Sequence, residues 1–210
     1  MNSLWKAVAV TALGCLISII SGCASSNLVD IWHDASFKTP PLNKMLVIAV
    51  RKDATRRRIW EDAFTGELAK HGVMATASYS LFPDAVPDTN QVIATVQANG
   101  FDGILVVLRL PMETNTKYIQ GFTTIEQNMG NITYWPRYWA RYYEIEYPGY
   151  IDTQKVAMSA IDVTTTGNGR LIWSATSRTP DPASATDIQQ GIAGLVMSKL
   201  AQRNIISPKK

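Results

Sequence analysis

Two uninterrupted apolar runs constrain the fold of this chain most strongly. They are KMLVIAV at residues 44–50 and ILVVLRL at residues 104–110. Strands this apolar must be covered on both faces, which is typical of the central strands of a parallel sheet. Between them lie helical patterns at residues 55–71 and 89–99, each closed by a glycine, and a predicted strand at residues 73–81. This alternation of strands and helices predicts parallel crossovers in a layered domain.

The second half of the chain has the pattern of an antiparallel sheet followed by a helix. Residues 114–127 are typical of one long strand, and residues 155–163 and 170–177 of two more. The turn TGNG at residues 166–169 predicts that the last two form a hairpin. An amphipathic helix follows at residues 185–202. The predicted fold class is α/β: a single layered domain whose mixed sheet is parallel (βαβαβ) in its first half and antiparallel in its second, with helices packed on it.

Apolar stripes at helical spacing predict which face of each helix is buried. The predicted inward residues are, helix by helix, Ile59, Trp60, Ala63, Phe64 and Leu68; Val92, Ile93 and Val96; and Ile188, Ile192, Leu195, Val196 and Leu200. Thr186 and Gln189 can form a capping box at the start of the last helix.

The amino terminus has the order of a bacterial lipoprotein signal peptide. Residues 1–6 carry one lysine, the 14 residues 7–20 carry no charge, and small residues precede Cys23. This apolar run is shorter than the ~20 residues that cross a bilayer as a helix. The sequence ISGC at residues 20–23 resembles a lipobox, in which the cysteine becomes the new amino terminus and its thiolate takes up lipid. We therefore predict that Cys23 carries the lipid, palmitate for example. Because Ala24 follows it, we predict attachment to the cell outer membrane, facing the periplasm, if the source has two membranes.

The predicted segments are a signal peptide at 1–22, a lipidated tether at 23–41, one α/β domain at 42–206 with an aromatic-rich excursion at 130–150, and a tail at 207–210. Within the tether, VDIWHDASF can pack as a short strand. Cys15 leaves with the signal peptide and Cys23 takes up lipid, so no disulfide is expected. Without Lys6 the formal net charge of +3 falls to about +2, which excludes a typical nucleic-acid-binding protein.

Three stretches of the chain carry a resemblance to a known group of proteins. They are RRRIWEDAFTGELAKHGVMATASYSLFP, GFDGILVV and GRLIWSATSRTPDP. They resemble a group of uncharacterised bacterial lipoproteins with a domain of unknown function. The α/β layout of that group is similar to the amino-terminal domain of TolB and to CsgG-type envelope lipoproteins. The resemblance covers nearly the whole mature chain. It implies a fold and an envelope role, and it transfers no catalytic residue.

The sequence offers little support for catalysis. It contains no nucleophile elbow, phosphate loop or dinucleotide fingerprint. Two histidines, His33 and His71, without a cysteine pair do not predict a metal site, and we expect no cofactor. Glu144 and Glu146 lie on one side of a predicted strand, about 7 Å apart. Paired carboxylates hydrolyse glycosides, so a cell-wall glycan hydrolase using this pair is the alternative function; two solvated charges on a strand are the simpler interpretation.

The aromatic segment from Tyr134 to Tyr150, YWPRYWARYYEIEYPGY, holds six of the eight tyrosines and two of the six tryptophans. So many rings cannot all point inward from one strand, since neighbouring residues alternate faces. Aromatic side chains interleaved with arginine are enriched at recognition surfaces. The candidate partner-binding residues are Tyr134, Trp135, Arg137, Tyr138, Trp139, Arg141, Tyr142 and Tyr143. The competing interpretation is a hairpin whose rings pack back on the sheet.

A basic cluster precedes and opens the first predicted helix. Its members, the candidate anion contacts, are Arg51, Lys52, Arg56, Arg57 and Arg58. Cations at a helix amino terminus oppose the helix dipole, although Arg57 with Glu61 and Arg58 with Asp62 can form i,i+4 pairs. The cluster is therefore either a solvated, self-paired face or a contact for a lipid headgroup, a lipopolysaccharide phosphate or a wall carboxylate.

These features favour a lipid-anchored periplasmic envelope protein that acts as a non-catalytic binding or assembly module. Its membrane contact is the lipid on Cys23, and its expected partner is an envelope protein or a glycan that meets the aromatic and arginine-rich surface. Exposed rings can also be covered by another copy of the chain, which makes a homo-oligomer a further expectation.

Overall fold

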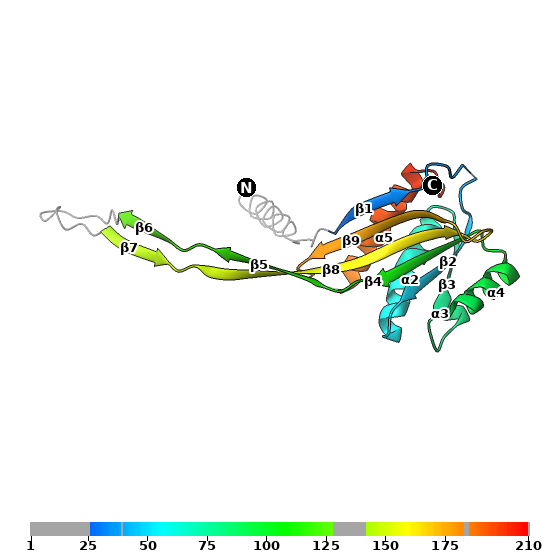
Figure 1. Ribbon diagram of the computed structural model, residues 1–210, viewed down its shortest axis with the longest axis horizontal. Coiled ribbons are helices and arrows are strands. Elements are labelled where there is room, and N and C mark those ends of the chain that lie inside the picture. Colours follow the sequence, from blue (N-terminus) through cyan, green and yellow to red (C-terminus); the bar gives the residue numbers. More distant parts are fainter. Residues whose placement is uncertain (1–25, 39, 128–141, 183–184, 210) are drawn as a thin grey trace, which may run out of the picture.

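The computed structural model describes residues 26–38, 40–127, 142–182 and 185–209, with side chains throughout except at 124–127, 142–145 and 185–187. The main sheet contains β1 (Asn27–His33), β2 (Lys44–Val50), β3 (Met74–Ala77), β4 (Gly103–Arg109), β5 (Glu113–Ile119), β8 (Tyr150–Thr165) and β9 (Leu171–Pro180). Their order is β1-β9-β8-β4-β2-β3, and β5 pairs with the outer part of β8 (Figure 1). The predicted α/β class with a mixed sheet is confirmed.

The parallel part of the sheet has the predicted βαβαβ arrangement. β2 lies between β3 and β4 and runs parallel to both. The helices α2 (Ala54–Lys70) and α4 (Thr89–Asn99) make the crossovers. α4 begins with a capping box between Asp88 and Gln91 and ends at Gly100, whose φ of 63° is left-handed. Glycine adopts this conformation without steric cost, which explains the helix end read from the sequence.

The strand predicted at residues 73–81 is wrong in its second half. β3 ends at Ala77, and a short helix, α3 (Ser78–Leu81), follows it. The Ser78 hydroxyl donates to Glu61 Oε1 at 2.7 Å, and the Tyr79 N–H donates to Glu61 Oε2 at 2.8 Å. These two hydrogen bonds to α2 hold residues 78–81 outside the sheet. They join residues far apart in the chain, so local β propensity could not predict them.

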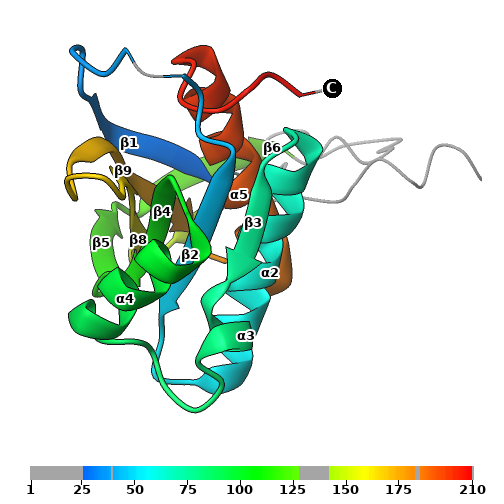
Figure 2. The ribbon, with the colours of Figure 1, turned by 90° about the vertical axis from the view of Figure 1, so that its right-hand side faces the viewer.

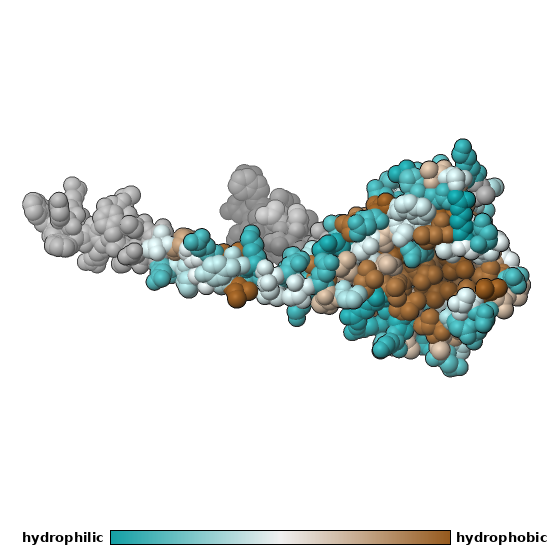
Figure 3. Space-filling view, viewed as in Figure 1, coloured by the Kyte–Doolittle hydropathy of each residue, from teal (hydrophilic) through white to brown (hydrophobic). Residues whose placement is uncertain are grey.

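Helices cover both faces of the sheet (Figure 2). α2 and α5 (Ala185–Gln202) pack on one face over the larger core, and α4 covers part of the other face over a smaller cluster. Trp60, Phe64 and Leu68 are buried in the larger core as predicted. Between α4 and the antiparallel strands, Figure 3 shows apolar side chains gathered on the second face, where Leu108 is 43% exposed.

Two predicted inward residues are exposed. Ile93 is 50% exposed, since α4 meets the sheet mainly through Val92 and Val96. Leu195 is 38% exposed, and Ala193 and Met197 are buried instead. The buried stripe of α5 is thus turned away from Leu195, because tertiary contacts with α2 and the sheet fix the rotation of the helix about its own axis.

No helix in the described ranges is both long and apolar enough to cross a membrane.

The antiparallel half extends the sheet on the other side of β4. β8 and β9 form the predicted hairpin. β1, which lies inside the interval predicted as a tether, pairs antiparallel with β9 at the sheet edge. The side chain of Ser26, the first described residue, bonds to Thr179 at 2.8 Å. The chain therefore enters the domain beside the carboxyl end of β9.

A two-stranded arm projects from the main body (Figure 1). Its inner part pairs β5 with residues 150–156 of β8, and its outer part pairs β6 (Phe122–Gln127) with β7 (Tyr142–Tyr147). The single strand predicted at residues 114–127 is therefore wrong: Gln120 and Gly121 separate β5 from β6. The described end of the predicted excursion, residues 142–150, forms β7 and the start of β8.

Candidate functional site

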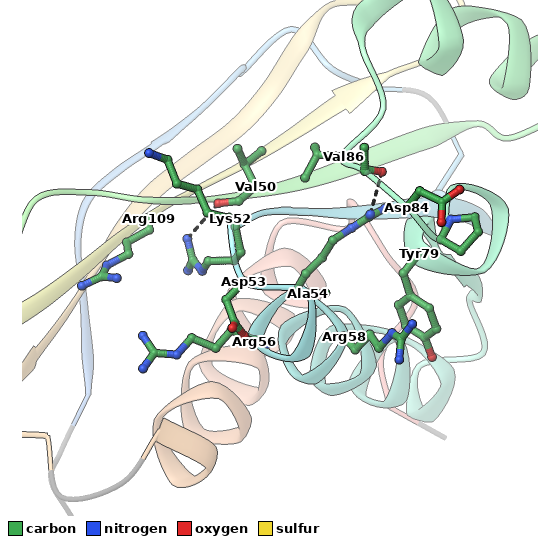
Figure 4. A pocket seen from close by; sticks show the side chains of 14 residues that line it. Val50, Lys52, Asp53, Ala54, Arg56, Arg58, Tyr79, Asp84, Val86 and Arg109 are labelled. Atoms are coloured by element: carbon green, nitrogen blue, oxygen red, sulfur yellow. Dashed lines mark hydrogen bonds between the residues drawn. The ribbon is translucent and has the colours of Figure 1, made fainter.

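A basic cleft lies at the edge of the sheet where β2 and β4 end. We define it by Arg51, Lys52, Arg56, Arg58 and Arg109, which together with the loop at residues 83–86 line a cavity of about 710 Å³. Parallel sheets bind ligands at the carboxyl ends of their strands, and this cavity has that position. In Figure 4, Arg56 and Arg109 point to one side of the cavity, and Arg58 lies beside Tyr79 on the other.

The cleft is positioned by the cap of α2. Asp53 precedes the helix in an extended conformation, and its Oδ1 accepts the N–H of Arg56 at 2.7 Å. An aspartate in this place satisfies a free helix N–H and complements the positive end of the dipole. The cap thus offsets part of the cost of opening a helix with arginines. Asp53 was not among the predicted site residues, although a capping aspartate before an amphipathic run is a recognisable signal.

Arg57 points inward, away from the other members of the cluster. Only 4% of its surface is exposed. Its Nε donates to Glu61 Oε1 at 3.0 Å, and its terminal nitrogens donate to the carbonyls of Phe82 and Ala85 and to the Ser78 hydroxyl. The predicted Arg57–Glu61 pair is confirmed. Its guanidinium holds the loop that forms one wall of the basic cleft.

Glu61 is the fully buried carboxylate that joins three elements. Besides Arg57 and Ser78, its oxygens accept the N–H of Ala49 in β2 at 3.0 Å and the N–H of Tyr79 in α3 at 2.8 Å. A buried charge is tolerated only when it is paired and fully hydrogen-bonded, and Glu61 meets both conditions. From the sequence, we expected Glu61 only as a surface partner of Arg57.

Three arginines meet between the ends of β2, β4 and α2 without a carboxylate partner. Arg51 is half-buried, and its guanidinium lies 4.5 Å from the centre of the Trp60 ring. Partial burial, together with the like charges of Arg109 and Arg56, lowers the pKa of Arg51 to about 10. Among the side chains that the structure describes, no carboxylate forms an ion pair with Arg51, Arg56 or Arg109.

Arg109 was absent from the predicted cluster because it lies far along the chain from Arg51. The sequence contained a usable signal, since both residues end or follow strands predicted to be parallel. The carboxyl ends of parallel strands meet at one edge, and β2 and β4 are direct neighbours. Predicting that adjacency would have brought the two side chains together.

Arg58 lies on the opposite wall of the cleft. Its guanidinium lies 5.7 Å from the centre of the Tyr79 ring. Asp62, which we predicted to pair with Arg58, accepts the Tyr79 hydroxyl at 2.7 Å. This hydrogen bond to the carboxylate raises the pKa of Tyr79. Asp62 and Arg58 therefore meet through the tyrosine, rather than through the direct pair expected from their spacing.

Other predicted site residues lie largely outside the described part of the chain. These are Cys23, Tyr134, Trp135, Arg137, Tyr138, Trp139 and Arg141. The backbones of Tyr142 and Tyr143 lie in β7, opposite Gln127 and Glu126.

The alternative carboxylate pair lies on the arm. Glu144 and Glu146 are two residues apart in β7, opposite Ile125 and Thr123. The backbones of both residues lie in one strand, as predicted, and Glu146 does not line the basic cleft. His71 Nδ1 bonds to the Ser207 carbonyl at 2.9 Å. Among the described residues, no group of three potential metal ligands comes together.

Comparisons with known proteins give distant structural similarities. No protein-family model and no curated protein matches the chain. The PelC dodecamer from Paraburkholderia phytofirmans aligns with 83% of this chain and 96% of its own, at 10% identity and a TM-score of 0.46. The lipoprotein GNA1162 from Neisseria meningitidis aligns with 76% of this chain and 99% of its own, at 13% identity and a TM-score of 0.41.

Proposed function

We propose that this protein is a lipid-anchored envelope protein that binds an anionic group in its basic cleft and performs no catalysis. One observation supports the site: Arg51, Arg56 and Arg109 surround a cavity, and no described carboxylate pairs with them. Holding like charges together costs electrostatic free energy, which a bound anion offsets. Phosphate and carboxylate groups match the planar donor fork of arginine.

The proposed anchor rests on the sequence ISGC at residues 20–23. Lipid on Cys23 would hold the domain at a membrane surface, in the periplasm and at the outer membrane of a two-membrane cell. The aromatic segment at 134–150 stays our proposed contact for an envelope protein, a glycan or a second copy of the chain. A protein that binds through its basic cleft and its aromatic segment, and is attached to a membrane through Cys23, has the properties of an assembly module.

Titration calorimetry with inorganic pyrophosphate, at constant ionic strength, tests the basic cleft. We expect saturable binding, and we expect the Arg51→Gln, Arg109→Gln double variant to bind at least tenfold more weakly, since hydrogen bonds to charged groups contribute roughly 1.5–3 kcal/mol each. Arg203→Gln, beyond the carboxyl end of α5, is the matched control and removes the same charge elsewhere. Absence of saturable binding, or an equal loss in the control, would contradict the proposal.

The anchor is tested by replacing the lipid-accepting thiol. Cys23→Ser should leave an unlipidated precursor that keeps its signal peptide, because a serine hydroxyl does not take up the lipid. Metabolic labelling with a fatty-acid analogue, followed by gel analysis, measures the modification. Undiminished label in the variant would show that the lipid lies elsewhere or is absent from Cys23.

A further inference from the structure

A second cavity adjoins the basic cleft and adds an apolar surface beside the arginines. It has a volume of about 180 Å³ and shares Arg51, Arg56 and Arg109 with the basic cleft. We call it the apolar groove, and its apolar lining consists of Trp60, Leu110, Met112, Ala157, Met158 and Ile188. The three arginines therefore stand between a charged cavity and an apolar one.

Arg51 marks the boundary between the two cavities. Its guanidinium stacks over the ring of Trp60, and one of its terminal nitrogens donates to the Ser159 hydroxyl at 3.2 Å. Trp60 and Ser159 both line the apolar groove. A ligand that places its anion against Arg51 would thus have an aromatic and aliphatic surface directly beside it.

The apolar groove also contains a polar atom that lacks a partner. Gln189 is only 2% exposed, and its Oε1 accepts no hydrogen bond from the described residues. A buried acceptor without a donor is unfavourable, so native structures supply a partner for nearly all of them. This oxygen is shielded from solvent, and we assign it no contact with the ligand.

Ser26, the first described residue, lies at the same end of the domain as the apolar groove. Ser26 bonds to Thr179, and Thr179 pairs across the sheet with Ala157, which lines the apolar groove. Cys23 precedes Ser26 by three positions, a reach of about 11 Å for an extended chain. Lipid on Cys23 would therefore tether the groove end of the domain close to the membrane.

We propose that the ligand of the basic cleft is an anionic amphiphile. Its phosphate or carboxylate head is held by the three shared arginines, and its apolar chain lies in the apolar groove. The inference rests on the proposed anion site and adds the apolar part of the ligand. At roughly 30 Å³ per water-sized group, the apolar groove takes a chain of about six carbon atoms.

A homologous series of phosphate monoesters separates the two proposals. Full-length protein in a nonionic detergent is titrated with methyl, butyl and hexyl phosphate, which are soluble without forming micelles at the concentrations used. Each buried methylene should tighten binding about fourfold, from the transfer free energy of roughly 0.8 kcal/mol per CH₂. Equal affinity across the series would overturn the amphiphile proposal and leave the anion site standing. Failure of all three esters and of pyrophosphate to bind would overturn both.

Filling the apolar groove gives an independent test. Ala157→Leu places a larger side chain in the groove, and Ala160→Leu adds the same volume on the opposite face of β8. We expect Ala157→Leu to abolish the increase in affinity with chain length, while methyl phosphate still binds. We expect Ala160→Leu to keep that increase. A gain that persists in Ala157→Leu would contradict the proposal. Met112→Ser, at a 45% exposed position, is a second variant that does not depend on core packing and should reduce the gain.

The source of the amphiphile is tested with vesicles. Vesicles of phosphatidylcholine containing phosphatidic acid should displace hexyl phosphate if the natural ligand is a membrane lipid, and vesicles of phosphatidylcholine alone should not. Displacement by neither, with the chain-length gain intact, assigns the site to a free amphiphile. Equal displacement by both would show that the head group is not recognised and would overturn the proposal.

Discussion

At the scale of single residues, three consecutive arginines have three different environments. Successive side chains of a helix differ in direction by about 100°. Arg57 therefore points into the core while Arg56 and Arg58 lie on opposite walls of the basic cleft. The buried member needs a buried counter-charge, which Glu61 supplies one turn later. The buried Arg57–Glu61 pair holds the loop through the carbonyls of Phe82 and Ala85. Arg56 and Arg58 are available to a ligand.

Glu61→Gln should reduce the free energy of unfolding by about 3–5 kcal/mol, since removing one partner leaves Arg57 as an uncompensated buried charge. Glu67→Gln is the matched control, because the Glu67–Lys70 pair lies on the exposed face of the same helix and should contribute at most about 1 kcal/mol. Urea denaturation measures both values. Similar losses in the two variants would show that Glu61 does not organise the cleft wall.

At the scale of elements, the arm is the part least supported by the core. Its outer part, β6 with β7, is a separate two-stranded sheet, and such ribbons are marginally stable alone. Tyr118, Phe122, Tyr150 and Ile151 are each at least 60% exposed along it. Where the inner and outer parts meet, Gly121 and Gly149 approach so closely that a Cβ on Gly121 would lie 2.5 Å from the backbone nitrogen of Gly149 and 2.5 Å from the carbonyl oxygen of Tyr147. Glycine is required at this junction by close contact rather than by φ.

Gly121→Ala should push β6 away from β7 and loosen the outer arm, because the added methyl group would lie 2.5 Å from backbone atoms of Tyr147 and Gly149, which cannot rotate aside as a side chain can. Hydrogen exchange of the β6 and β7 amides should become faster, while the thermal melting of the main body stays unchanged. Gly167→Ala is the control, since its added Cβ meets nothing within 4 Å. Unchanged exchange in Gly121→Ala would mean that the strands accommodate the methyl group and that glycine is not required at this junction.

At the scale of the whole molecule, the arm, the chain entry and both cavities lie at one end of the main body. β5 and the outer part of β8 leave the sheet beside Leu110, Met112 and Ala157, which line the apolar groove. An anchored molecule would thus have its cleft near the lipid and its arm extending from the same end. The exposed rings along the arm are those expected of a surface that another molecule covers.

Replacing Trp139 and Tyr143 together with serine should leave the domain folded and abolish self-association or partner capture. The pattern of alternation places both on one face of a strand, so the change removes rings from one side only. Circular dichroism and thermal melting report the fold, and sedimentation velocity with a pull-down from envelope extract reports the contacts. Unfolding would show that the rings belong to a core. A folded variant that keeps every contact would exclude this segment as the recognition surface.

The sequence alone determined the parallel half of the sheet and most of its helices. Runs such as KMLVIAV are too apolar to face water on either side, and Gly100 ends α4 through a local backbone preference. Both signals reside in neighbouring residues. The lipobox at 20–23 is equally local, and the anchor it predicts stays a prediction.

Only the tertiary structure decided which charged residues form the cleft. Arg109 joins Arg51 because β4 pairs with β2, and Glu61 is buried because three elements supply donors to it. The break of the arm at Gly121 likewise depends on Gly149, on the opposite strand. Contacts between residues far apart in the chain set the burial and direction of these side chains, and hydrophobic periodicity carries no information about such contacts.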